Sequence, residues 1–508
     1  MKKFITPILL TLMLSQSFTI NAQHGVGSQW TSDLELPTPP STTSVRGYLY
    51  NFIVVFSNGK RVVFLNSEDG PNSIYYTYSY DGINWSNPQA FNPVSAIGMS
   101  SPKIIADQND MLHIIWASQL PKGLYYTKMD SALNIIQDSV RISDNPDFGK
   151  FNGMYLTVDR KDRLHVMWHE GKTGIDVPEI YYSRSIDGGA TWSLKDSLSV
   201  PDGLPSAFPR GQFKAYSGDT LAIFWRDSTS SPVPNDWDIN MVVSQDGGAN
   251  WSYPPTAVLS NHNFQGDPDL VIAPDGRFHL FHHESNIAAP YWDMRLLYNY
   301  SDDLGVTWNP SPTNNDTVSN AQRSYLAEGS KYDIQNNVLW TFWKEEDLLG
   351  LQGGDMVAAY SKDNGVSWST PEYVSDRNDT TIGFKTASLL PNGGLGICYE
   401  LPNYPSAGKL RVFYKERSPL ALSINSITDD NNISIYPNPT TGHVKVQFGE
   451  LKAQKIEVFN MNGQLVFNKQ LSKNHTSTDL DFNSYLKGIY VLKLRSADSV
   501  LSKKIIKQ

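Results

Sequence analysis

The chain has 508 residues, a formal net charge of −9 at pH 7 and one cysteine, Cys398. A single cysteine excludes an intramolecular disulfide framework, so packing must stabilise the fold. The mild acidity argues against nucleic acid as a partner. Aromatic residues make up 12% of the chain, a share that suits both a packed β core and a surface that stacks on sugars.

The N-terminal segment, residues 1–23, has the three parts of a signal peptide. Lys2 and Lys3 come first, the apolar run ITPILLTLMLS follows, and a polar stretch closes in INAQ. The apolar run is too short to span a bilayer, and no other stretch qualifies. We therefore expect the mature protein to be exported and soluble.

Seven apolar segments recur between residues 45 and 417, at intervals of about 52 to 61 residues. They read RVVFLNS, LHIIWAS, LHVMWHE, LAIFWRD, FHLFHHE, LWTFWKE and LGICYEL. Each is followed by a further apolar strand such as SIYYTYS or EIYYSRS. Repeats of this length indicate a propeller or solenoid. The last unit stops after KLRVFYKERS, so we expect the N-terminal QWTSDLEL to supply its outer strand and close the ring.

A short phrase of the form S-x-D-x-G-x-x-W occurs four times, and a fifth copy, at residues 79–85, is one residue shorter. It spans residues 79–85, 185–192, 244–251, 301–308 and 361–368. It resembles the Asp-box of the sialidase-like (BNR) β-propellers, in which Asp and Gly shape a hairpin turn and Trp packs beneath it. The resemblance implies an all-β propeller. The seven apolar segments predict seven blades, with the six-bladed sialidase arrangement as the alternative. In that family the box is a structural turn remote from the active site.

The C-terminal part departs from the repeat. Residues 418–432 are polar and read as a linker. Residues 433–508 hold alternating strands joined by Asn-Gly and Pro-Asn-Pro turns, and they resemble the C-terminal sorting domain of type IX secretion substrates. The resemblance implies a small β-sandwich that serves as an address, with the type IX machinery as partner and the cell surface or medium as destination. The propeller then occupies residues 24–417.

Topology predicts where a propeller site lies. In a four-stranded blade the inner strand begins at the same end of the barrel at which the second strand ends, and ligands of propellers usually bind at such a rim. The residues after the aromatic position of each second strand are Asn66, Ala117, His169, Arg226, His283, Lys344 and Glu400. The segments that lead into inner strands add Arg46, Arg210, His262 and Arg323. We interpret three further histidines, His113, His165 and His279, as packing residues inside apolar strands.

Such a rim favours β-elimination from a uronate-containing polysaccharide. A base removes the proton α to the carboxylate, a cation neutralises the carboxylate, and Tyr or His protonates the leaving oxygen. The architecture resembles the seven-bladed ulvan lyases, whose groove uses His, Tyr and Arg, and residues 262–284 look like a pattern of related BNR proteins. The predicted catalytic residues are His169, Arg226, His283, Lys344 and Tyr325. The predicted substrate-binding residues are Arg46, Arg210, His262, Arg323 and Glu400.

Two alternatives stay open. Arg46, Arg210 and Arg323 stand where the arginine triad of a sialidase would, but no Glu lies about fifteen residues ahead of Arg210 or Arg323 to pair with a nucleophilic tyrosine. A surface propeller that binds glycans without catalysis is the other alternative. We expect no cofactor and no catalytic metal, because the adjacent His282 and His283 point to opposite faces of a strand. A structural calcium is left open.

Overall fold

The structure is a computed structural model in which the chain forms two compact bodies, Met1–Leu420 and Ala421–Gln508. It describes the following residues: 29–40, 42, 44–46, 52–67, 74–93, 99–143, 153–172, 175–207, 219–228, 237–259, 264–285, 294–309, 316–317, 324–325, 329–334, 336–345, 355–376, 385–402, 410–420, 434–448, 455–460, 465–471, 476–495 and 500–508. The predicted signal peptide lies outside these ranges, as does the segment 421–433. Within them, no helix is long and apolar enough to cross a membrane.

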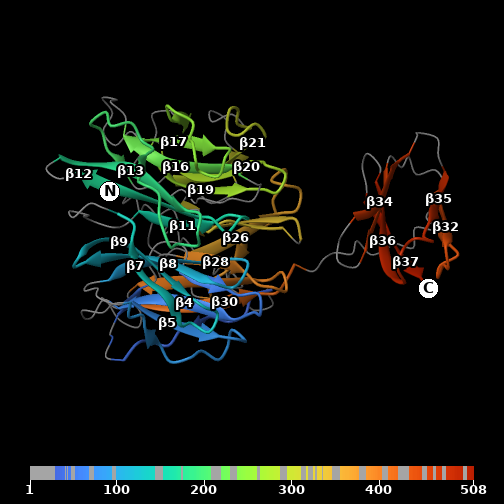
Figure 1. Ribbon diagram of the computed structural model, residues 1–508, viewed down its shortest axis with the longest axis horizontal. Helices are drawn as coiled ribbons and strands as arrows, with labels where there is room; N and C mark the ends of the chain where they lie inside the picture. Colours follow the sequence, from blue (N-terminus) through green and yellow to red (C-terminus); the bar gives the residue numbers. More distant parts are fainter. Residues whose placement is uncertain are drawn as a thin grey trace, which may run out of the picture. The chain divides into compact units, whose positions relative to one another are not determined.

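In the residues that the structure describes, the first body is built from antiparallel groups of four or five strands, called blades 1 to 7 here in chain order (Figure 1). Blade 1 holds β2 (Val45–Arg46), β3 (Ile53–Val55), β4 (Arg61–Ser67), β5 (Ile74–Ser79) and β6 (Gln89–Ala90). Blade 2 holds β7 (Ser100–Ala106), β8 (Leu112–Gln119), β9 (Lys122–Met129) and β10 (Ile135–Arg141). Blade 3 holds β11 (Met154–Val158), β12 (Leu164–Lys172), β13 (Ile175–Ser185) and β14 (Asp196–Ser197).

Blades 4 and 5 are joined into one sheet by a parallel contact between Trp237 and Phe264. Blade 4 holds β15 (Ser206–Ala207), β16 (Leu221–Ser228), β17 (Trp237–Ser244) and β18 (Thr256–Leu259). Blade 5 holds β19 (Phe264–Ile272), β20 (Phe278–Ser285), β21 (Met294–Ser301) and β22 (Asp316–Thr317). Blade 6 holds β23 (Ser324–Tyr325), β24 (Lys331–Asp333), β25 (Val338–Glu345), β26 (Asp355–Ser361) and β27 (Glu372–Tyr373).

Blade 7 closes the ring with a strand from the other end of the chain. It holds β28 (Lys385–Leu389), β29 (Leu395–Pro402), β30 (Leu410–Arg417) and β1 (Leu34–Glu35). Leu34 pairs with Tyr414 on β30, which confirms the expectation that the N-terminal segment supplies the outer strand. The ammonium of Lys415 is fully buried and lies 3.0 Å from Asp33 and 2.5 Å from Asp376. This ion cluster fastens the closing strand.

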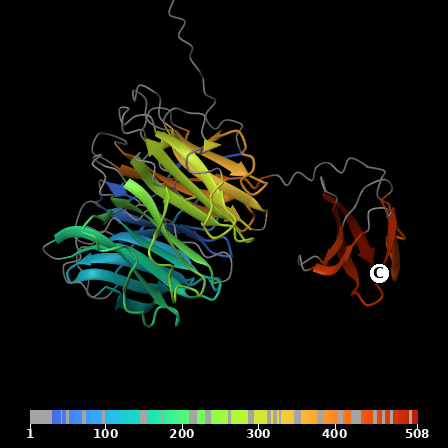
Figure 2. The same ribbon diagram turned by 90° about the horizontal axis from the view of Figure 1, so that it is seen from above.

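The core lies between the faces of neighbouring blades, which stack side by side in Figure 2. Strand residues point alternately to the two faces, so each blade contributes to two apolar layers. Trp168 of blade 3 packs in the layer shared with Ile115 and Tyr126 of blade 2, whereas Met167 packs with Trp225 of blade 4. The seven apolar segments of the sequence are the second strands of these blades. Nearly every position in them is apolar because each of these strands is buried on both faces.

The Asp-boxes form the turns after the third strands. In the box of blade 3, the Ser185 hydroxyl donates to Asp187 (2.7 Å) and accepts from the backbone N–H of Gly189 (2.8 Å). Hydrogen bonds from the side chain and backbone of Thr191 lower the pKa of Asp187 to about 2. Gly189 has φ +95°, and a Cβ there would overlap the Tyr126 ring of blade 2. The box is thus a turn that locks onto the preceding blade.

The second body has two sheets around one core. One sheet contains β31 (Ser434–Tyr436), β32 (His443–Gln447) and β35 (Ser477–Asp481). The other contains β34 (Leu465–Gln470), β33 (Lys455–Asn460), β36 (Gly488–Arg495) and β37 (Val500–Lys507). Val446 from the first sheet and Val458 and Leu492 from the second are fully buried in a shared cluster.

Candidate functional site

Strand register brings the predicted residues to one end of the blades. Arg46, in β2, lies opposite Asn66 near the end of β4. Tyr325, in β23, lies opposite Lys344 near the end of β25, and Ala207 lies opposite Arg226 in blade 4. The start of each of these inner strands is therefore adjacent to the end of the second strand. We call this end the strand-end rim, and the other end, which carries the Asp-boxes, the box rim.

Four predicted site residues are described with their side chains. His169 is half-buried on β12, where its backbone pairs with Ile180, and Lys344 is half-buried on β25. Arg226 is 8% exposed, and its guanidinium carbon lies 5.5 Å from the centre of the Trp237 ring. Glu400 is 2% exposed and so presents little of its carboxyl group to solvent. Substrate contact by Glu400 stays a prediction.

For three more predicted residues only the backbone is described. His283 pairs with Gly266 on β19 and Leu296 on β21, so it lies near the end of β20. Tyr325 and Arg46 lie in inner strands at the same rim. The remaining three, Arg210, His262 and Arg323, lie outside the described residues.

A tryptophan–carboxylate pair recurs at this rim. In blade 3 the indole N–H of Trp168 donates to Glu170 (2.9 Å), and Lys195 donates to the other oxygen of Glu170 (2.9 Å). In blade 6 the indole N–H of Trp343 donates to Glu345 (2.8 Å). A basic residue stands between the two partners each time: His169 in blade 3 and Lys344 in blade 6.

A buried carboxyl group, that of Glu179, and a half-buried one, that of Asp227, lie between blades 3 and 4. The hydroxyl of Ser206 lies 2.9 Å from Asp227 and 3.4 Å from Glu179, and Ser199 also donates to Glu179. Burial raises the pKa of Asp227 above its ordinary value, although bonds from Ser206 and Asn240 oppose the rise. Burial, with repulsion from Asp227, likewise raises the pKa of Glu179. Sequence reasoning missed Glu179, because only the register that sets it opposite Glu170 brings it to this rim.

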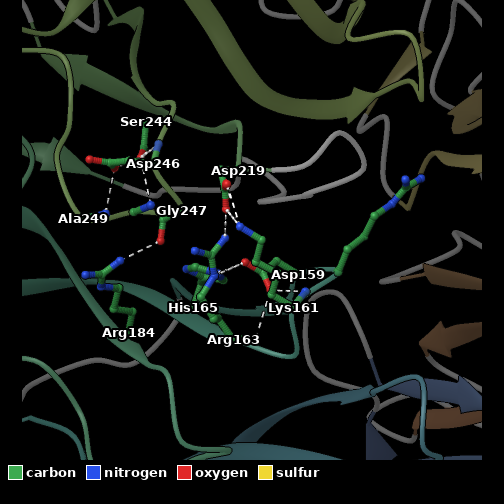
Figure 3. Close-up of polar contacts among 12 residues, drawn as sticks. Asp159, Lys161, Arg163, His165, Arg184, Asp219, Ser244, Asp246, Gly247 and Ala249 are labelled. Atoms are coloured by element: carbon green, nitrogen blue, oxygen red, sulfur yellow. Dashed lines mark hydrogen bonds and ion pairs between the residues drawn. The ribbon is translucent and has the colours of Figure 1, made fainter.

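The box rim holds a dense polar network between blades 3 and 4 (Figure 3). Arg163 binds both Asp159 of its own blade and Asp219 of the next blade, the latter at 2.5 Å. Asp219 also binds Lys161 at 2.8 Å. Arg184 donates to the backbone oxygen of Gly247 in the Asp-box of blade 4 (3.0 Å). These contacts join blade 3 to blade 4.

The three histidines predicted to be packing residues are buried at this rim. His165 lies 2.8 Å from the Tyr182 hydroxyl and 3.3 Å from Asp159, and burial lowers its pKa. His113 and His279 make the same contact with Tyr126 and Tyr298, each at 2.7 Å. The packing interpretation is confirmed. Separately, His282 is fully buried and bonded to Asn299 (2.9 Å), and the described residues contain no group of three metal-ligating side chains.

Comparison with known proteins gives matches to both parts. Residues 212–434 match a family described as the BNR repeat-like domain, and residues 434–508 match the secretion system C-terminal sorting domain. Ulvan lyase NLR42 from Nonlabens ulvanivorans is 24% identical over 130 residues, which are 25% of this chain and 23% of that protein. The match therefore spans less than a quarter of the relative's length.

Solved structures share the fold. A polysaccharide lyase family PL25 ulvan lyase, bound to -[GlcA(1-4)Rha3S]-, aligns with a TM-score of 0.52 and 10% identity over 75% of this chain and 95% of its own. The intramolecular trans-sialidase from Ruminococcus gnavus aligns with a TM-score of 0.42 and 12% identity over 76% and 97%. At 10% identity, the likeness to the ulvan lyase shows the fold alone. The first body thus shares the fold of the ulvan lyase structure, part of it matches the BNR repeat-like domain, and residues 434–508 match the secretion system C-terminal sorting domain.

Proposed function

We propose that this protein is an exported lyase that cleaves an acidic, uronate-containing polysaccharide by β-elimination. The observation that carries the proposal is the row of basic residues near the ends of second strands: His169 in blade 3, Arg226 in blade 4, His283 in blade 5 and Lys344 in blade 6. A polyanion that lies along this rim meets one such residue in each of four successive blades. The partial match to an ulvan lyase supports this substrate class.

Elimination needs three kinds of group, and the rim supplies each. Arg226 stays charged at any working pH and would neutralise the uronate carboxylate, which makes the α proton more acidic. A neutral imidazole, His169 or His283, would take that proton, since histidine titrates near neutral pH. The electron pair left on carbon forms the double bond as the C–O bond breaks. Tyr325, opposite Lys344 in the sheet, would protonate the leaving oxygen.

The remaining predicted residues would extend the binding surface. Arg46, Arg210, His262 and Arg323 lead into inner strands in the sequence and would bind neighbouring acidic sugars. Glu400 would contact the substrate from a more buried position. No metal or cofactor enters this scheme.

Export follows from the sorting domain. Residues 434–508 match a secretion-system sorting domain, and we propose that residues 1–23 act as the signal peptide of a type IX substrate. The propeller would then work at the cell surface or in the medium, where large polysaccharides are found.

The test is incubation of the purified protein with ulvan and other uronate polysaccharides, and with sialylated glycans. Ultraviolet absorbance reports unsaturated uronate, and released sialic acid is measured in parallel. We expect absorbance to rise for at least one uronate polymer and to stay flat for His169→Ala. The matched control is His443→Ala, which changes an exposed histidine of the sorting domain. Free sialic acid without absorbance would instead favour the Arg46, Arg210 and Arg323 triad, and silence in both assays would favour a glycan-binding propeller.

A further inference from the structure

In blade 3, hydrogen bonds link three side chains close to His169: Trp168, Glu170 and Lys195. The carboxyl of Glu170 is 4% exposed and binds the Trp168 indole on one side and the Lys195 ammonium on the other, each at 2.9 Å. Lys195 also lies 4.9 Å from the centre of the Tyr181 ring. A buried carboxylate is costly unless it is paired, and these two contacts pair both oxygens of Glu170.

Two of these hydrogen-bonded residues directly precede and follow His169 in the sequence. Trp168 and Glu170 are two residues apart and so share one face of β12, while His169 points to the other face. The β ladder pairs the backbone of His169 with Ile180, and the bond between the side chains before and after His169 adds a second restraint on this stretch of β12. The recurrence of the same bond around Lys344, between Trp343 and Glu345, shows that the arrangement is a feature of the rim rather than of one blade.

We infer that Glu170, held by Trp168 and Lys195, is a positioning residue for His169. Glu170 fixes His169 at the strand-end rim, and it also offsets the charge of Lys195. The role of His169 in catalysis rests on the proposed function; its placement by Glu170 does not. Among the side chains that the structure describes, the charged groups at this end of blades 3 and 4 include Glu170, Glu179, Lys195, Asp196, Asp202, Arg226, Asp227 and Asp238.

Opposite charge changes at the two partners provide the test. Glu170→Gln leaves the Lys195 ammonium uncompensated, which disfavours a second positive charge nearby and lowers the pKa of His169. Lys195→Met leaves the Glu170 carboxylate uncompensated, which raises the pKa of His169. Loosened packing alone would not give shifts of opposite sign. The pKa is read by NMR titration of imidazole signals in the full chain, in which His169→Gln identifies the His169 signal among the ten histidines.

A control and a kinetic measurement complete the experiment. Glu416→Gln changes a strand glutamate that binds Arg61 at the box rim, and should leave the His169 titration unchanged. If the protein is a lyase, Glu170→Gln should lower kcat about tenfold with KM nearly unchanged, as expected for a displaced catalytic group, and the pH profile should move with the NMR pKa.

Shifts of opposite sign support the inference, even when no polysaccharide is cleaved and the proposed function fails. Unchanged titration in both variants, or shifts of the same sign, would overturn it. Lys195 is 27% exposed, so Lys195→Met keeps the test available if Glu170→Gln does not fold.

Discussion

Gly248, in the Asp-box of blade 4, offers a quantitative test of how the boxes hold the blades together. Its φ is +77°, and a Cβ at this position would overlap the hydroxyl oxygen of Tyr182 and lie 2.8 Å from the ring carbon that bears it. Tyr182 is 1% exposed, and its hydroxyl bonds to His165 at 2.8 Å. The tyrosine therefore cannot retreat without breaking a buried hydrogen bond.

The expected cost of Gly248→Ala is the sum of three effects. The left-handed backbone costs an alanine about 1 kcal/mol. Overpacking against a buried ring adds roughly 1–3 kcal/mol, and loss of the hydrogen bond to His165 adds about 1 kcal/mol. We expect the free energy of unfolding to fall by about 4 kcal/mol.

Gly276 is the matched control for backbone strain. It has φ +95°, but a Cβ there would meet no atom within 4 Å, so Gly276→Ala should cost only about 1 kcal/mol. The effect of alanine on the unfolded chain is the same at both positions and cancels in the comparison. Urea unfolding followed by tryptophan fluorescence measures both values. A difference of less than about 1 kcal/mol would refute the claim that the box locks onto Tyr182, as would a failure of Tyr182→Phe to relieve part of the cost of Gly248→Ala.

Three further predictions concern the ring closure, the response to pH and the two histidines of β12. Lys415→Met leaves Asp33 and Asp376 without their buried cation, and should lower the free energy of unfolding by about 3–5 kcal/mol, measured by urea titration; no change would show that the closing strand is held by its backbone alone. Burial lowers the pKa of His279 from 6.5 to about 3, so stability that is present above pH 6.5 should be lost as the pH falls toward 3. His279→Gln should flatten that slope in urea midpoints measured across the pH range, and an unchanged slope would place its origin elsewhere. His165→Ala should lower the melting temperature, because it removes the partner of Tyr182 and Asp159, whereas His169→Ala should abolish turnover with little change in melting temperature. Thermal melts and lyase assays on both variants check this, and a fall in melting temperature for His169→Ala would assign that histidine to the core.

The second strands could be predicted from sequence because they are buried on both faces, so their apolar runs stand out in every blade. The Asp-boxes could be predicted because each is a local turn whose residues bond to one another, as Ser185 and Asp187 do. The link between Arg163 and Asp219 could not be predicted, because it joins residues 56 positions apart through the stacking of two blades. Glu179 was missed for a related reason, since its place depends on the register of one hairpin.

Under the proposed function, the box rim serves stability and the strand-end rim serves chemistry. At the box rim the polar side chains make structural contacts. Arg163 binds two carboxylates, and His165 binds Tyr182. The box glycines Gly189 and Gly248 pack directly against tyrosines of the preceding blade. At the strand-end rim, His169 and Lys344 are only half-buried, in the second halves of β12 and β25. This separation explains why two histidines four residues apart on one strand, His165 and His169, are expected to serve stability and chemistry respectively.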